Sequence, residues 1–314
     1  MSKKNLFEFV EEGNLNEVHK LINKGLKIDT VDVDGNTPLI IASAHGYIEL
    51  IKYLINKKAK MNKANKDGVT PLIIASVYAH LPVIELLLSN GADVNQPDNE
   101  GKTPLYRAIY ENHVPVIELL LSKGANVNKP DNEGNTPIAF ASYNSNTPET
   151  VIALLNANAD SNKANHNNAT PLYFASHFGH DSIVELLLQQ PNVNVNNTVE
   201  DGSTPLMTAS ANGHEKVVKM LLTHGAKVDH RDEFGDTATI IAANENIRNL
   251  LKNYKRENTV VMTDAMLDQL RMGHALDADS KQDLYDFVGK GKKKTMNKKR
   301  KINRKRRQSN KKRK

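Results

Sequence analysis

One dipeptide recurs along this chain of 314 residues at an almost constant spacing. Thr-Pro occurs at residues 37–38, 70–71, 103–104, 136–137, 170–171 and 204–205, and a degenerate copy follows at Thr237-Ala238. The successive steps are 33, 33, 33, 34, 34 and 33 residues. A fixed period of this length indicates a repeat architecture, in which one supersecondary unit stacks on the next. Its length alone would suggest about two globular domains. The repeat instead predicts that the chain forms a linear array.

Other residues recur in step with Thr-Pro and indicate how each unit folds. The glycine two positions before most of the threonines can adopt positive φ in a tight turn. The threonine can cap a helix, and the proline suits the first helical position, where its missing N–H costs no hydrogen bond. An alanine four residues after each proline lets neighbouring units approach closely, and leucine-rich runs such as residues 86–88 supply the apolar face of a second helix. Each unit is expected to be a helix-turn-helix.

This pattern resembles the ankyrin repeat, whose unit has about 33 residues and a Thr-Pro-Leu-His-x-Ala signature. The resemblance covers roughly residues 5–255. It implies an all-α ankyrin-repeat solenoid with β-hairpin loops between the helix pairs. The expected domains are an N-terminal capping repeat (1–30), six full repeats and one truncated repeat (31–255), a short helical segment (256–289) and a disordered basic tail (290–314). Other residues, such as Ile40 and Tyr106, occupy the position of the signature histidine, so a hydrogen bond of the family is expected to be missing.

Members of this family typically bind protein partners through the hairpin tips and the exposed face of the first helix. The helix positions that correspond in this chain are Tyr78, Tyr110, Glu111, Tyr143, Asn144, His177 and Phe178. The corresponding hairpin positions are Lys66, Glu100, Lys102, Glu133 and His166. An aromatic residue recurs once per repeat across the four middle units, and exposed aromatic residues dominate binding hot spots. The alternative, that these aromatic rings pack against neighbouring helices, stays open.

The sequence does not point to catalysis. It has no cysteine, which excludes disulfides and thiolate metal sites. It also lacks a phosphate-binding loop of the Walker kind and a nucleophile elbow. His80, His113, His180 and His214 recur once per repeat at the start of the second helix, where structural roles are expected rather than metal binding. We therefore predict no enzymatic activity, no cofactor and no metal.

The sequence also carries an expectation about location. No run approaches the ~20 apolar residues that a membrane helix needs, and the N-terminal residues lack the apolar core of a signal peptide. We expect a monomeric intracellular protein of the nucleus or cytoplasm, without membrane association. The bias towards Asn, Lys and Ile, together with the repeats and a basic tail, resembles ankyrin proteins of large DNA viruses that infect protists. Intracellular bacteria and protists share this bias.

The repeat period stops after Tyr254. Residues 255–262 are predicted to be a linker, followed by short helices near residues 263–273 and 279–289. This segment can dock on the last repeat as an extra cap or act as a separate peptide motif. Some viral ankyrin proteins carry an F-box-like C-terminal segment that recruits ubiquitin ligases, but the Leu-Pro opening of that motif is not visible here.

The C-terminal residues 290–314 contain 16 Lys and Arg and no Asp or Glu. The rest of the chain has 26 basic and 36 acidic residues, a formal charge of −10. A segment with so little apolar content cannot fold alone. Its basic clusters have the spacing of a multipartite nuclear-import signal, which an importin would read. These clusters consist of Lys292, Lys293, Lys294, Lys298, Lys299, Arg300, Lys301, Arg304, Lys305, Arg306 and Arg307.

These features predict a non-catalytic scaffold that binds a protein partner on its concave surface and carries an import signal. Two alternatives stay open. In one, the tail contacts nucleic-acid phosphates, in a salt-dependent way, while the repeats recruit a partner. In the other, the protein is a ubiquitin-ligase adaptor. A tail that only improves solubility is also compatible with this composition.

Overall fold

The computed structural model describes residues 5–144 and 147–271, and the side chains of these ranges up to residue 258. Within them the chain forms sixteen α-helices and no β-strand. The helices are α1 (Leu6–Glu11), α2 (Leu15–Asn23), α3 (Pro38–His45), α4 (Ile48–Asn56), α5 (Pro71–Val77), α6 (Leu81–Ser89), α7 (Pro104–Tyr110), α8 (Val114–Ser122), α9 (Pro137–Asn144), α10 (Pro148–Asn156), α11 (Pro171–Phe178), α12 (Asp181–Leu188), α13 (Pro205–Ala211), α14 (Glu215–Thr223), α15 (Ala238–Ile241) and α16 (Glu245–Arg271).

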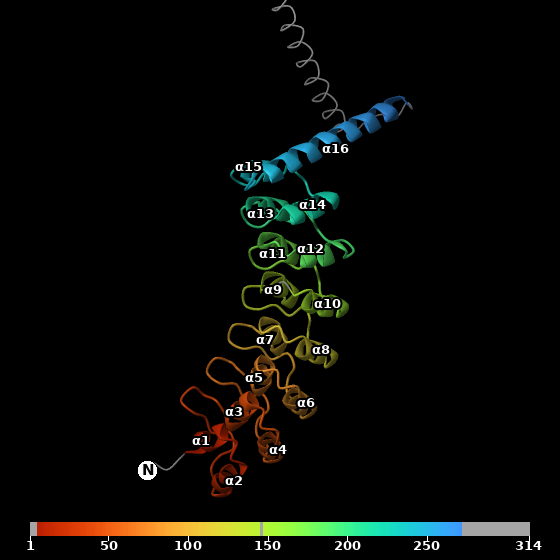
Figure 1. Ribbon diagram of the computed structural model, residues 1–314. Helices are drawn as coiled ribbons and strands as arrows, with labels where there is room; N and C mark the ends of the chain where they lie inside the picture. Colours follow the sequence, from red (N-terminus) through yellow and green to blue (C-terminus); the bar gives the residue numbers. More distant parts are fainter. Residues whose placement is uncertain (1–4, 145–146, 272–314) are drawn as a thin grey trace, which may run out of the picture. The chain divides into compact units, whose positions relative to one another are not determined.

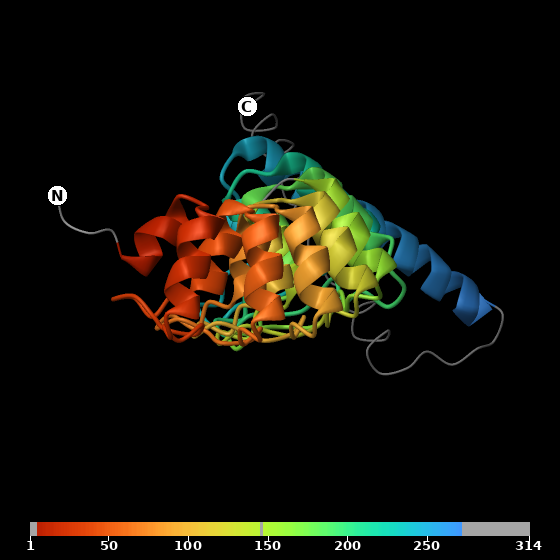
Figure 2. The same ribbon diagram turned by 90° about the horizontal axis from the view of Figure 1, so that it is seen from below.

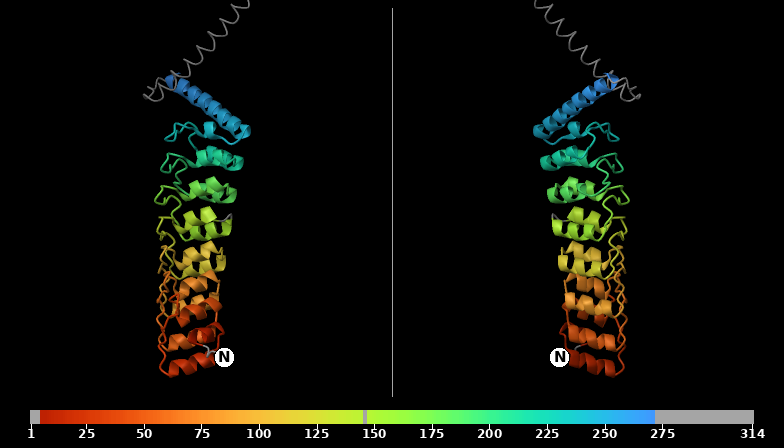
Figure 3. Two further views of the ribbon diagram at one scale, coloured as in Figure 1. Left: turned by 90° about the vertical axis from the view of Figure 1, so that its left-hand side faces the viewer. Right: turned by 90° about the vertical axis from the view of Figure 1, so that its right-hand side faces the viewer.

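The helices of the residues before α16 stack in two layers. Each Thr-Pro unit from α3 to α14 contributes one helix to each layer, and the first helix of each unit packs against the first helix of the next (Figure 1). The loops that precede the first helices gather along one edge of the stack, as the view along it shows (Figure 2). The two side views place these loops on one side of the helices throughout (Figure 3). This arrangement is an all-α solenoid and confirms the predicted fold class.

The Thr-Pro pair begins each first helix as expected. The Thr37 hydroxyl oxygen accepts a hydrogen bond from the amide N–H of Ile40 at 3.2 Å, and Thr70 does the same for Ile73 at 3.2 Å. These threonines cap the helix, and the proline that follows occupies its first position. The cap therefore fixes where the first helix of each Thr-Pro unit starts relative to its loop.

The loop glycine is required by both its backbone conformation and its neighbours. Gly68 has φ +81°, and a Cβ atom added to it would lie 2.5 Å from the amide nitrogen of Asn99 in the next loop. A side chain there would push adjacent loops apart. Asn168 occupies the same position of its loop with φ 60°, since asparagine tolerates this region better than other non-glycine residues.

Small and large apolar side chains fill the space between units. Ala75 and Ala108 on the first helices are completely buried, as are Leu87 and Leu120 on the second helices. Burying a leucine side chain contributes about 1.5–3 kcal/mol, and the alanines let the first helices pack closely. The core is thus repeated along the stack, and each unit depends on its neighbours for burial.

The loops are tight turns instead of the predicted β-hairpins. In the loop before α7, the amide N–H of Asp98 donates to the carbonyl oxygen of Lys102 at 3.0 Å. One Asp98 carboxylate oxygen accepts from the amide N–H groups of Glu100 and Lys102, both at 2.9 Å. A side chain therefore closes the turn, and the tips of consecutive loops are joined by single backbone hydrogen bonds, such as that from the amide N–H of Asn99 to the carbonyl oxygen of Asp67 at 3.0 Å.

The predicted linker at residues 255–262 is wrong, because α16 is one helix from Glu245 to Arg271. The chain divides into two compact units, Met1–Ile247 and Arg248–Lys314, and their boundary falls within α16. The second short helix that we predicted near residues 279–289 lies outside the described residues. Among the helices that are described, none combines the length and the apolar character needed to cross a membrane.

Candidate functional site

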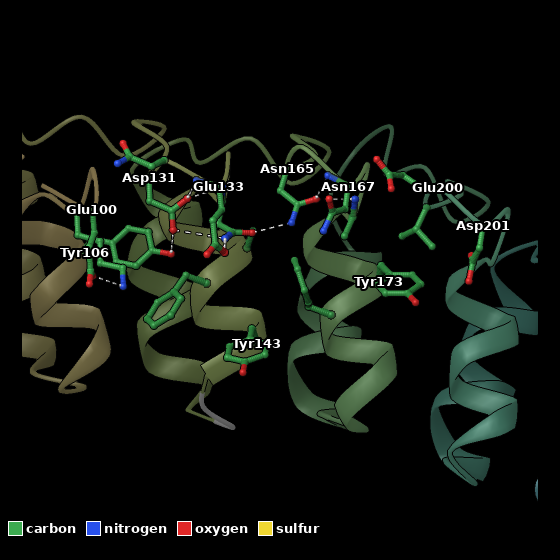
Figure 4. A pocket seen from close by; sticks show the side chains of 18 of the residues that line it. Glu100, Tyr106, Asp131, Glu133, Tyr143, Asn165, Asn167, Tyr173, Glu200 and Asp201 are labelled. Atoms are coloured by element: carbon green, nitrogen blue, oxygen red, sulfur yellow. Dashed lines mark hydrogen bonds and ion pairs between the residues drawn. The ribbon is translucent and has the colours of Figure 1, made fainter.

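A groove of about 890 Å³ runs along the loops and the first-helix layer of the stack. It crosses the four loops that precede α7, α9, α11 and α13 and extends over the helices α7, α9 and α11. Figure 4 shows the carboxylate side chains beside the loops and Tyr143 farther along its helix. The residues that line it are Asn99, Glu100, Lys102, Tyr106, Asp131, Asn132, Glu133, Asn135, Ala139, Phe140, Tyr143, Asn165, Asn167, Ala169, Tyr173, Phe174, Val199, Glu200 and Asp201.

The charge of this groove is predominantly negative. Its lining includes five carboxylates and one cationic side chain, Lys102. The ammonium of Lys102 lies 2.7 Å from the Glu100 carboxylate, and the guanidinium of Arg107 lies 3.1 Å from it. The hydrogen bond and charge of Lys102 lower the pKa of the Glu100 carboxyl, burial opposes this effect, and the charge and hydrogen bond of Arg107 lower the pKa further. Both nearby cations are thus engaged with Glu100.

The wall of the groove near α7 is held by a buried hydrogen bond between two repeats. The hydroxyl of Tyr106 donates to the carboxylate of Asp131 at 2.6 Å, and both side chains are buried. Burial first, and then the hydrogen bond to Asp131, raises the pKa of the Tyr106 phenol, which keeps it protonated. Tyr106 occupies the signature-histidine position, so our expectation of a missing hydrogen bond there is corrected: tyrosine makes a different bond, to the next repeat.

Aromatic rings form the helix side of the groove. The Phe140 ring lies 4.5 Å from that of Tyr106 and 6.0 Å from that of Tyr110, measured between centroids. Tyr143 lies 5.9 Å from Phe174 in an edge-on arrangement. Sequence reasoning missed Phe140 and Phe174, although their spacing of 34 residues follows the repeat. Their position, three residues after the proline, is the signal that could have found them.

The structure places the four recurring aromatic residues at the surface. Tyr78, Tyr110, Tyr143 and Phe178 are 56%, 52%, 48% and 42% exposed. They also touch neighbouring rings, since Tyr143 and Phe178 stack edge-on with their centroids 5.0 Å apart. Of the four, Tyr143 lines the groove. These four rings therefore combine partial exposure with contacts to neighbouring rings.

The other predicted site residues are spread over the surface. Glu100, Lys102 and Glu133 line the groove, whereas Lys66 and His166 lie in loops outside its lining. The ammonium of Lys66 donates to the carbonyl oxygen of Val33 at 2.6 Å. Asn144 donates to the carbonyl oxygen of Tyr110 at 3.2 Å, and Glu111 is the exposed residue that directly follows α7.

His177 is integrated into the packing between repeats. Its Nδ1 atom lies 2.8 Å from the hydroxyl of Thr208, and its ring is half-buried. Burial, followed by the nearby His214, lowers the pKa of the His177 imidazole. A neutral, hydrogen-bonded ring is therefore favoured at this position near neutral pH.

The histidines at the start of the second helices have the predicted structural role. The Nε2 atoms of His80, His113 and His214 lie 3.0, 2.9 and 3.0 Å from carbonyl oxygens of Ala44, Val77 and His177 in the preceding repeats. The Nδ1 atom of His180 lies 3.1 Å from the carbonyl oxygen of Ser142. Since a carbonyl only accepts, each ring nitrogen donates, and the histidines tie consecutive units together.

An asparagine ladder on the other loops was missed by sequence reasoning. The Asn128 side chain accepts from the amide N–H of Asp160 at 2.8 Å and donates to the carbonyl oxygen of Asn158 at 3.4 Å. The same two bonds recur at equivalent positions along the stack. Each amide joins one repeat to the next, so these asparagines have a structural role in this fold. The ladder consists of Asn62, Asn95, Asn128, Asn162 and Asn196.

The basic residues predicted as an import signal or nucleic-acid contact, Lys292 to Arg307, lie outside the residues that the structure describes.

The structure thus defines a class of protein: a helical-repeat solenoid with an open groove between its loops and first helices. A family model described as "Ankyrin repeats (3 copies)" matches residues 6–98, 61–131, 91–165, 124–198 and 190–262. Together these matches cover most of the chain, and the protein belongs to the ankyrin-repeat family, as the sequence pattern predicted. Membership of this family indicates a protein-interaction scaffold. Comparison with curated protein sequences found no significant match.

Proposed function

We propose that this protein is a non-catalytic scaffold that binds a segment of a protein partner in the groove of residues 99–201. The observation that carries the proposal is the groove itself, which crosses four consecutive loops and is lined by polar and aromatic side chains, among them the exposed Tyr143. Such a surface offers the aromatic anchors and polar rim that protein interfaces use.

The aromatic side chains provide a test of this proposal. Peptides that bind the full-length protein are first selected from a random peptide library. The affinity of the selected peptides is then measured for the original protein and for the double variant Tyr110→Ala/Tyr143→Ala. We expect the double variant to bind them more weakly by about 2 kcal/mol or more, because exposed aromatic anchors carry much of the binding energy of an interface. Circular dichroism should show an unchanged fold, since both side chains are about half exposed.

Ile152→Ala is the matched control, because Ile152 is a large, 40% exposed apolar residue on the second-helix layer. This control should bind the selected peptides like the original protein. Tyr143 lines the groove and Tyr110 lies against its lining residue Phe140, so if the double variant keeps its fold and binds the peptides equally well, the aromatic side of the groove is not the interaction surface. If the double variant unfolds, the aromatic residues serve packing.

The basic segment of residues 290–314 supports a second part of the proposal. Its 16 Lys and Arg without any acidic residue suit an importin, and we propose that it directs the protein to the nucleus. Contact with nucleic-acid phosphates is the alternative that the same charge favours. The groove, which is acidic, does not favour nucleic acid.

A further inference from the structure

We infer that the groove takes an extended, cationic segment of a partner protein, with large apolar side chains between its charges. This inference rests on the proposed function and specifies the chemistry of the ligand. It follows from the charge, the hydrogen bonding and the ring positions of the lining residues.

The first argument is electrostatic. Glu133, Glu200 and Asp201 are exposed in the groove, and none of them makes an ion pair with another residue in the described parts of the chain. The cations next to the groove, Lys102 and Arg107, are engaged with Glu100, and Arg107 also pairs with the buried Asp98 at 2.6 Å. A ligand with positive charge would neutralise the remaining carboxylates, whereas an acidic ligand would be repelled.

The second argument concerns the two sides of the groove. Figure 4 shows Glu133, Glu200 and Asp201 beside the loops, while Tyr143 lies farther along α9. Phe140 and Phe174 add apolar rings on the helix side of the lining. A ligand with both cationic and apolar side chains can satisfy both sides, and a cationic group near an aromatic face gains an additional attraction.

The third argument is the length of the groove. Neighbouring helices in such a stack are about 8–10 Å apart, so Glu133 and Glu200, which are two loops apart, are separated by about 16–20 Å. An extended chain covers about 3.3–3.6 Å per residue, so this distance corresponds to about five residues. Side chains of an extended chain alternate between its two faces, so cationic side chains about four or about six positions apart can both face the two glutamates.

The test uses synthetic probe peptides with two arginines about four or about six positions apart and leucine and alanine between them, so that both arginines lie on one face of the extended chain. Their affinity for the full-length protein is measured by fluorescence anisotropy. In Glu133→Gln/Glu200→Gln we expect an affinity about 3- to 10-fold lower, because two exposed ion pairs are lost. A peptide with glutamine in place of both arginines should bind the original protein more weakly to a similar extent.

The matched control is Glu118→Gln/Glu185→Gln, which removes the same charge from exposed positions on the second helices α8 and α12. This control should bind the arginine peptides like the original protein. An equal loss in both double variants would show that only net charge matters and would overturn the inference. No loss in the groove variant, or no binding of either arginine peptide at all, would overturn it as well.

The two proposals can fail separately. If the peptides selected from the library depend on Tyr110 and Tyr143 but are neutral or acidic, the groove binds proteins and the inference about charge is wrong. If an arginine peptide depends on Glu133 and Glu200, whereas peptides from the library are insensitive to the two tyrosines, the cationic site exists and the aromatic residues are not its anchors.

Discussion

At the scale of single residues, the pair Tyr106 and Asp131 shows how a change at one repeat position is accommodated. The phenol of Tyr106 occupies the position of the smaller signature histidine. It reaches Asp131 in the loop of the next repeat, 25 residues farther along the chain. Asp131 also accepts hydrogen bonds from the amide N–H groups of Glu133 and Asn135, at 3.0 and 2.9 Å. The pair therefore supports a groove loop and a helix together.

Removing this hydroxyl should destabilise the protein. In Tyr106→Phe we expect a loss of about 1–3 kcal/mol in the free energy of unfolding, because a buried carboxylate loses one donor. Chemical denaturation followed by circular dichroism measures the loss. Tyr110→Phe is the control, since Tyr110 is 52% exposed and should lose almost nothing. Equal stability of the two variants would mean that the bond at 2.6 Å contributes no net stability.

At the scale of elements, the helix pairs are held together by apolar packing and by polar ladders across the loops. The histidines join helices of consecutive repeats, and the asparagines join consecutive loops. Because each contact links only neighbours, the stability of the array is a sum of unit and interface terms.

One asparagine of the ladder tests the contribution of the loops. Asn128→Ala removes the acceptor of the exposed amide N–H of Asp160 at 2.8 Å, and because water can replace this acceptor we expect about 0.5–1.5 kcal/mol lower stability. Asn167→Ala is the control, because no hydrogen bond of the Asn167 side chain is found within the described residues. The free energies of unfolding of both variants, obtained in urea, give the comparison.

A core leucine tests the coupling between units. Leu87→Ala creates a cavity at a completely buried position of α6, and we expect a cost of about 2–5 kcal/mol. Because the coupling is between neighbours, the two sides of this repeat should then unfold in separate transitions. Hydrogen exchange along the chain detects them. A single transition with an unchanged midpoint would contradict the solenoid description.

At the scale of the whole molecule, the charge is divided unevenly along the chain. Residues 1–289 carry a formal charge of −10, and residues 290–314 carry +16. The acidic part would repel nucleic acid, so any affinity for polyanions is expected to reside in the basic segment.

Removal of this segment tests its two proposed roles. A chain that ends at Gly289 should remain monomeric and keep its partner in the groove. It should lose nuclear accumulation, observed by microscopy, and retention on a nucleic-acid column. In the full-length protein, several hundred millimolar salt should also abolish retention, because counterion release no longer favours binding. Tight binding by the shortened chain in high salt would place the nucleic-acid site elsewhere.

Much of the fold could be predicted from local sequence patterns. Thr-Pro, the loop glycines and the leucine-rich runs act within one repeat, and their period of 33 or 34 residues determines the stacking. The recurrence of the histidines at one position of the repeat likewise indicates their structural role. Because every unit has the same kind of neighbour, the local patterns that fold one repeat also determine how the repeats stack along the chain.

The sequence alone thus determined the repeat, the helix starts, the family and the division of charge. Only the tertiary structure decided which side chains meet across repeats: Tyr106 with Asp131, the asparagine ladder, and Phe140 and Phe174 in the groove. It also decided that α16 continues through the predicted linker. The physical reason is that the repeat pattern gives the place of each residue within its unit but not its contacts. The residue that a side chain contacts in the next unit depends on the length and direction of that side chain.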